Sequence, residues 1–293
     1  MRIFPRRGRR VFAWSRRALI GLILLIGAFG SGGVAAFDPA LPDDAGLADD
    51  SASPSHFLPD DLLAAYDAGQ WDAVIARGTA MQSAGGFVMA SRAFLASVMY
   101  DDQPDQQKQA AQQAVDWADR ALALDADAIE ILLQAAASYG VRAQINRSLS
   151  DAMASKRFLE KAYEIDPDDP RVLASFGFWH GRVILGAGSF LGGLFFGADR
   201  DQAIDLFQRS LEQDPDNLLI HAGFGRLLLR FGKARLRPLA VDHLKQSLLY
   251  AATSVHEQRA QEDSRILLEA DAAGATTGQL ADLADQRAPF KQT

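Results

Sequence analysis

Three segments of this chain end in the same way: an apolar run stops at an Asp-x-Asp sequence that begins at Asp125, Asp166 or Asp214. Before each stop, apolar residues return every three or four positions, which is the period of an amphipathic helix. Two of the stops contain Asp-Pro, and the residue before a proline is pushed out of the helical conformation. The same helix ending at three places in the sequence predicts a repeated helical unit.

A second pattern precedes these stops: a small, a bulky and a small residue, then the stop, at intervals of four, three and five positions. Small residues four and three apart lie on one helix face and let a neighbouring helix approach closely. A fourth copy keeps the spacing without the acidic stop. The copies are Ala114, Ala118, Ala121 and Ala126; Ser155, Leu159, Ala162 and Pro167; Ala203, Phe207, Ser210 and Pro215; and Ala240, Leu244, Ser247 and Ala252.

The helices that precede two of these copies each contain a glycine at the same place, Gly177 and Gly225. A residue without a Cβ allows close approach, so we expect the paired helix to cross there. From Pro59 onward no strand-like alternation of useful length occurs, which predicts an all-α fold.

These units resemble the tetratricopeptide repeat (TPR) superfamily, over about residues 60–252. The resemblance implies a right-handed superhelical array of helix–turn–helix pairs, with about four to five degenerate repeats. Successive stops lie 41, 48 and 37 residues apart, whereas the family repeats about every 34. A non-repetitive helical bundle is the alternative. The repeat-defining residues are Gly177, Gly225, Ala162, Pro167, Ala203, Phe207 and Pro215.

The N-terminus has the pattern of an export signal. Residues 1–36 carry seven arginines and no acidic residue, and the apolar run 18–30 precedes small residues that end at Ala36. Cleavage after Ala36 would give an exported, periplasmic protein. A retained membrane anchor over residues 18–37 is the alternative, because this stretch has no charge. In that case the N-terminus alone would contact the membrane.

The rest of the chain divides by composition. Residues 37–58 are rich in Asp and Pro and predict a disordered acidic linker, 59–272 the repeat domain, and 273–293 a flexible tail. Without the seven arginines of the leader, 23 basic residues face 37 acidic ones. Because the part of the chain after the leader is this acidic, it repels nucleic acid, and we exclude nucleic acid as a partner.

The segment 186–198 combines glycines with large apolar residues. Dense glycine predicts a loop, followed by a helix capped at Asp199. Its apolar side chains would close the core, line a ligand pocket or touch a membrane. The candidates for binding are Phe190, Leu194, Phe195 and Phe196.

The stretch GGLFFGADRDQAIDLFQRSLEQDP resembles, more weakly, the periplasmic T component of TRAP-type transporters. This resemblance implies a helical protein with an apolar route through it. The chain has no Cys, so it lacks the lipoprotein cysteine of that component.

Other candidate residues are histidines and arginines. His180 and His221 lie in successive first helices, where we expect them to face one another, as packing residues rather than metal ligands. Arg226, Arg230 and Arg235 stand out against the acidic background. They either compensate a helix end or clamp a carboxylate or phosphate of a partner.

No catalytic or metal-binding spacing occurs, so we expect no enzyme, no cofactor and no metal. Our first hypothesis is an exported, non-enzymatic scaffold that binds a protein partner, a cell-envelope protein or transporter component, in a concave groove. The alternative is a periplasmic small-molecule-binding accessory component of a transport system, which uses the segment 186–198.

Overall fold

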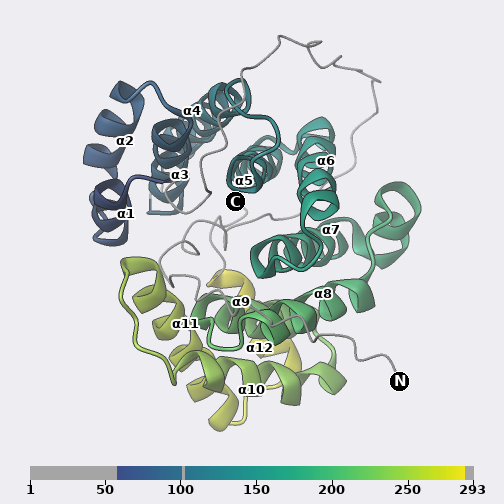
Figure 1. The fold of residues 1–293 in the computed structure, drawn as a ribbon. Coiled ribbons are helices and arrows are strands. Elements are labelled where there is room, and N and C mark those ends of the chain that lie inside the picture. The colour runs from purple at the N-terminus through teal and green to yellow at the C-terminus, as the bar shows by residue number, and fades with distance from the viewer. Residues whose placement is uncertain (1–57, 101–102, 288–293) are drawn as a thin grey trace, which may run out of the picture.

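The computed structural model describes residues 58–100 and 103–287, with the side chains of residues 100, 187–191 and 195 left out (Figure 1). The described residues form twelve α-helices and one 3-10 helix and no strand, which confirms the all-α class. Their bounds are α1 Asp60–Asp67, α2 Trp71–Ala80, α3 Ala84–Tyr100, α4 Pro104–Leu122, α5 Ile129–Asn146, α6 Leu149–Ile165, α7 Pro170–Phe196, α8 Arg200–Gln213, α9 Leu218–Arg230, η3 Ala234–Leu236, α10 Arg237–Ser247, α11 Val255–Ala272 and α12 Thr277–Gln286.

The helices pack as consecutive pairs. The first helices α3, α5, α7 and α9 pack against the second helices α4, α6, α8 and α10, respectively. Each first helix also contacts the next one along the chain, and α9 contacts α11. The same order of contacts between helices therefore recurs along the chain, and Figure 1 shows the pairs following one another around a centre, with α1 and α11 facing each other.

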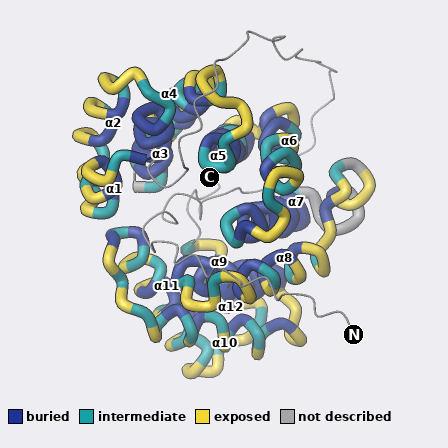
Figure 2. Tube along the Cα trace, in the orientation of Figure 1, coloured by how far each residue is buried: buried dark blue, intermediate teal, exposed yellow. Residues whose placement is uncertain are grey.

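The small–bulky–small pattern marks the buried face of every second helix. Its three helical positions are all buried in α4, α6, α8 and α10 (Figure 2). A Cβ built on Gly177 would lie 2.9 Å from Phe207 Cδ2, and one built on Gly225 would lie 2.9 Å from the carbonyl oxygen of Ala240. The paired helices thus cross at the two glycines, as predicted.

Serine hydroxyls fasten the pairs where their backbones come close. Ser155 Oγ of α6 donates to the carbonyl of Ala136 in α5 at 2.8 Å. Ser210 Oγ of α8 donates to the carbonyl of Pro170 in α7 at 2.7 Å. A serine at these positions is small enough for the two helices to approach closely, and its hydroxyl donates a hydrogen bond to a backbone oxygen of the paired helix.

Two of the three acidic stops end their helices directly, as expected, whereas Asp125 follows two residues after the C-cap of α4, Ala123. Asp166 and Asp214 follow the last residues of α6 and α8, and Asn217 caps α9 by accepting from the N–H of Ile220. The cap of α7 is Asp169, which accepts from the N–H groups of Arg171 and Val172.

The loop predicted over 186–198 is wrong, because α7 continues through this segment to Phe196. A Cβ on Gly192 would nevertheless lie 3.4 Å from Val183 Cγ1, although nine residues of straight helix span about 13 Å. The helix is therefore sharply bent between these positions, where Gly186 and Gly188 lie, and such kinks are typical of glycine. Asp199 caps α8 as predicted.

The C-terminal segment also differs from the prediction. We expected a flexible tail from residue 273, but α12 packs against α9 and buries Leu280 and Ala284. A capping box at Thr276 and Gln279 begins this helix. Leu280 and Ala284 lie one turn apart on the same face of this short helix, and their burial packs α12 against α9.

The predicted signal or anchor, including its membrane-spanning alternative, and residues 37–57 of the predicted linker lie outside the described residues, whereas Leu58, the last residue of that linker, is buried in the core. Within residues 58–100 and 103–287, no helix is long and apolar enough to cross a membrane.

Gly225→Ala tests the close crossing. The added methyl would meet the Ala240 carbonyl and Leu244 Cγ at 2.9 and 2.8 Å, so we expect a loss of about 1–3 kcal/mol in the free energy of unfolding. In the control Gly278→Ala, no atom lies within 4 Å of the new Cβ. This change in α12 should stabilise by up to about 1 kcal/mol. Urea denaturation compares the two, and equal stabilisation by both would contradict the crossing.

Candidate functional site

The two ends of the helical array meet where the α1–α2 turn packs against the start of α11. The ring of His256 lies 4.9 Å from that of Tyr66 and 6.0 Å from that of Trp71, measured between centroids. Gly69, at φ +76°, makes the turn, and a Cβ there would lie 3.5 Å from Val255 Cγ1. The aromatic contact joins elements almost 200 residues apart in sequence, so the array closes on itself.

A cleft of about 600 Å³ opens at this junction. One face of α11 forms a wall, because five of its residues recur at helical spacing. Trp71 and the α1–α2 turn line the other side, and Arg287 lies at the end of α12. The lining residues are Ala68, Gly69, Trp71, Val255, Gln258, Arg259, Glu262, Asp263 and Arg287.

An arginine cluster adjoins this cleft through Asp263. Arg226 Nη1 donates to Asp263 Oδ2 at 3.3 Å and to the carbonyl of Arg287 at 3.4 Å. Arg230, one turn further along α9, pairs with Asp285 of α12. These contacts tie α9 to both C-terminal helices.

Arg182 of α7 belongs to the same cluster but has no such contact. It is 6% exposed, and among the described residues it makes no hydrogen bond and no ion pair. Burial lowers the pKa of Arg182 well below its usual value, and the neighbouring Arg230 and Arg226 lower it further. The guanidinium nevertheless stays charged in proteins.

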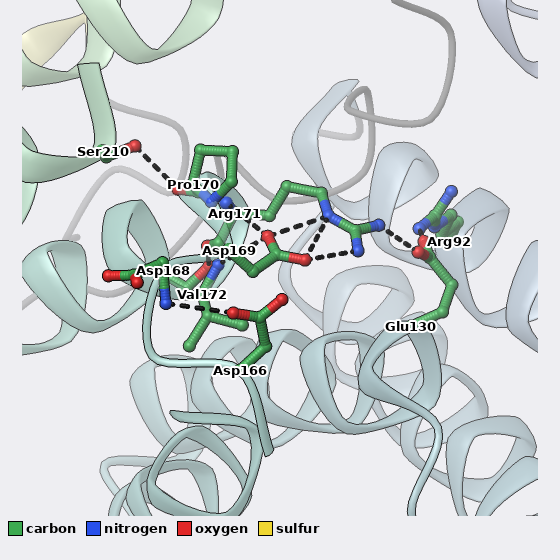
Figure 3. A network of polar contacts seen from close by, with 10 residues as sticks. Arg92, Glu130, Asp166, Asp168, Asp169, Pro170, Arg171, Val172 and Ser210 are labelled. Atoms are coloured by element: carbon green, nitrogen blue, oxygen red, sulfur yellow. Dashed lines mark hydrogen bonds and ion pairs between the residues drawn. The ribbon is translucent and has the colours of Figure 1, made fainter. Parts of the chain in front are cut away.

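A second polar cluster connects α3, α5 and α7, and its charges balance (Figure 3). Glu130 pairs with both Arg92 and Arg171, and Arg171 Nη2 also pairs with Asp169 at 2.7 Å. All four side chains are at most 13% exposed. Here each buried arginine has its carboxylate, which makes this network a link between successive first helices.

The two candidate histidines do not face one another as predicted. His180 Nδ1 accepts from the N–H of Asp199 at 3.1 Å, at the start of α8. His221 lies near the start of α9, where its Nε2 contacts the carbonyl oxygen of Pro215 and its Nδ1 contacts the ring nitrogen Nδ1 of His243, both at 2.9 Å. The prediction failed because Gly177 and Gly225 set the register, which matches His221 to Leu173 and not to His180.

The His221–His243 pair has a defined proton arrangement. Neutral His221 donates its Nε2–H to the Pro215 carbonyl, so its Nδ1 accepts from the Nδ1–H of His243. Burial lowers the pKa of His221, and burial together with His221 lowers the pKa of His243 to about 4. Both rings are therefore neutral packing groups near pH 7.

The three candidate arginines do not form one surface clamp. Arg226 and Arg230 are 15% and 9% exposed and point inward to Asp263 and Asp285. Arg235 is 71% exposed and lies 4.0 Å from Asp201 on the outside. The turn from Phe231 to Lys233 separates them, because it reverses the chain between α9 and α10.

The two candidate apolar residues whose side chains are described, Leu194 and Phe196, do not line the cleft. Leu194 is 65% exposed and Phe196 packs against the main core. The side chains of Phe190 and Phe195 lie outside the described set.

The sequence analysis missed Arg182, although a signal was present. The 48-residue shift that relates Gly177 to Gly225 also relates Arg182 to Arg230. The same position in two successive first helices thus holds arginine, in a body that is otherwise acidic.

Comparison with known proteins adds no family: no family model and no curated protein matches the chain. In the described part of the chain, no group of three or more His, Asp and Glu side chains could hold a metal ion.

Acid should weaken the closure. Burial lowers the pKa of His256 to about 4, whereas an unfolded histidine has a pKa of about 6.5. Between these values the unfolded chain binds a proton that the folded chain does not, so the free energy of unfolding falls as the pH drops. His256→Phe keeps a ring between Tyr66 and Trp71 but cannot bind the proton. Between about pH 7 and pH 5, the free energy of unfolding of this variant should fall by about 1–2 kcal/mol less than that of the parent.

Urea denaturation of both proteins at the two pH values measures this difference. The same pH dependence in parent and variant would contradict a neutral, buried His256.

Proposed function

We propose that this protein is an exported, non-enzymatic, TPR-like scaffold that binds a segment of a protein partner in the cell envelope. The observation that supports it most is the recurring pair of helices, with each first helix stacked on the next. Stacked helix pairs of this kind present extended surfaces on which peptide segments bind. The acidic surface argues against nucleic acid as the partner.

The cleft between the α1–α2 turn and α11 is the binding place that the geometry favours. The first helices α5, α7 and α9 are buried over most of their length, so they leave little inner surface for a partner. In the cleft, Gln258, Arg259 and Glu262 are exposed and Trp71 lines the facing side. Trp and Arg are the side chains that contribute most at protein interfaces.

A small-molecule-binding role in transport is the second candidate. It is favoured by the volume of the cleft, because pockets for small ligands measure about 300–1,000 Å³. In this case the ligand would contact α11 and Trp71, because the described side chains of the segment 186–198 do not line the cleft.

A photo-crosslinking residue at Gln258 tests the proposed binding place. In intact cells we expect Gln258 in the cleft to crosslink to one defined protein band, because its side chain is exposed beside Arg259 and Glu262. Gln208, an exposed glutamine of α8 outside the cleft, is the matched control. Crosslinking to the same band from both positions, or from Gln208 alone, would contradict the cleft as the binding place.

Export makes a separate prediction about the N-terminus. If the leader is cleaved after Ala36, N-terminal sequencing of the protein from the periplasmic fraction should begin at Phe37. A chain that keeps Met1 and stays in the membrane fraction would identify the leader as an anchor instead.

A further inference from the structure

At the crossing of α7 and α9, the arginine side chains carry more positive charge than the neighbouring carboxylates of the described residues neutralise. Arg182, Arg226 and Arg230 are all mostly buried. Around them, Asp263 is the buried carboxylate, at 7% exposed, and Asp285 is 63% exposed. Because a guanidinium does not lose its proton in a protein, three positive charges meet two negative ones, and Arg182 is the arginine that neither carboxylate pairs with.

The backbone holds these side chains together. A Cβ built on Gly181 would lie 2.6 Å from Leu227 Cδ2, so α7 and α9 touch at this point. Arg182 follows Gly181 directly, and Leu227 lies between Arg226 and Arg230. The two helices therefore bring the arginines to one place by a contact in which a larger residue at position 181 would displace the Leu227 side chain.

Hydrogen-bond donors also remain unused there. The Nε–H groups of Arg182 and Arg230 are both buried and have no acceptor in the described part of the chain. A buried donor without an acceptor costs about 1–3 kcal/mol, and more when it carries charge. An unpaired buried charge is costlier still, so a fold retains one where something else supplies the opposite charge.

We propose that Arg182 and Arg230, with Arg226 beside them, form a binding site for a small oxyanion, a carboxylate or a phosphate. Guanidinium groups bind both through paired N–H···O bonds. The three arginines are only 6–15% exposed, so the site takes a compact anionic group rather than a stretch of chain. It is distinct from the proposed partner cleft, to which it connects through Arg226 and Asp263.

Thermal unfolding of the purified full chain, dialysed into chloride, tests the site. Inorganic phosphate and acetate are added in separate arms at constant ionic strength. At about 100 times its dissociation constant, the bound anion should raise the melting temperature by roughly 5–10 °C. A rise with phosphate alone would identify phosphate as the ligand class, and a rise with acetate alone would identify a carboxylate.

Arg182→Met should abolish this rise, because it removes the unpaired guanidinium and keeps an unbranched apolar chain in place of the arginine stem. In chloride alone, the variant should melt at or above the temperature of the parent, since a buried charge without a counter-ion is gone. Arg235→Met, at an exposed arginine on the outside, is the control and should respond like the parent. A merely structural Arg182 would give the opposite result in chloride, a lower melting temperature.

If Arg182→Met does not fold, Arg182→Lys keeps the charge without the planar fork and should respond to the anions more weakly than the parent. An equal response of parent and folded Arg182 variant overturns the proposal. So does a parent that responds to neither anion and carries none in native mass spectrometry.

Discussion

The fold depends on one packing contact, the close crossing of the two helices within each pair. At Gly177 and Gly225 the first helix has no side chain, so the backbone of the second helix can approach until its carbonyl groups are in contact. Small residues of α4, α6, α8 and α10 complete this contact from the other side. Since each pair buries only part of its apolar surface alone, the next pair must stack on it, and the array follows.

Close crossing also determines which polar groups become buried. Where backbones touch, carbonyl groups lose water, and the hydroxyls of Ser155 and Ser210 replace it. The same approach between α7 and α9, at Gly181, brings Arg182 next to Arg230. Close helix crossing thus buries apolar side chains within the pairs and buries arginine side chains between α7 and α9. In the network around Glu130, each buried arginine pairs with a carboxylate. The cluster around Arg182 differs from this pattern, because Arg182 has no such partner among the described residues.

Local patterns predicted the fold class, the helix endings and the crossing glycines, because each depends on a few neighbouring residues. Asp199 as a cap is of this kind. The bend in α7 was not predictable in the same way: glycine density indicates where a helix is weak, but packing of Gly192 on Val183 decides whether the chain breaks or bends. The cleft was beyond sequence reasoning altogether, since Trp71 and Arg259 meet only through the closure of the array.

Closure changes what a repeat array of this kind offers to a ligand. In an open array the inner face of the first helices is the natural binding surface, but here α12 covers α9 and the α1–α2 turn meets α11. The cleft lies at this junction, where the ring of His256 packs near those of Tyr66 and Trp71. Because Asp263 lines the cleft and also pairs with Arg226, a ligand that draws Asp263 away would leave the arginine cluster with still less negative charge. Occupancy of the cleft and affinity of the cluster for an anion should therefore be coupled, and by linkage the coupling acts in both directions.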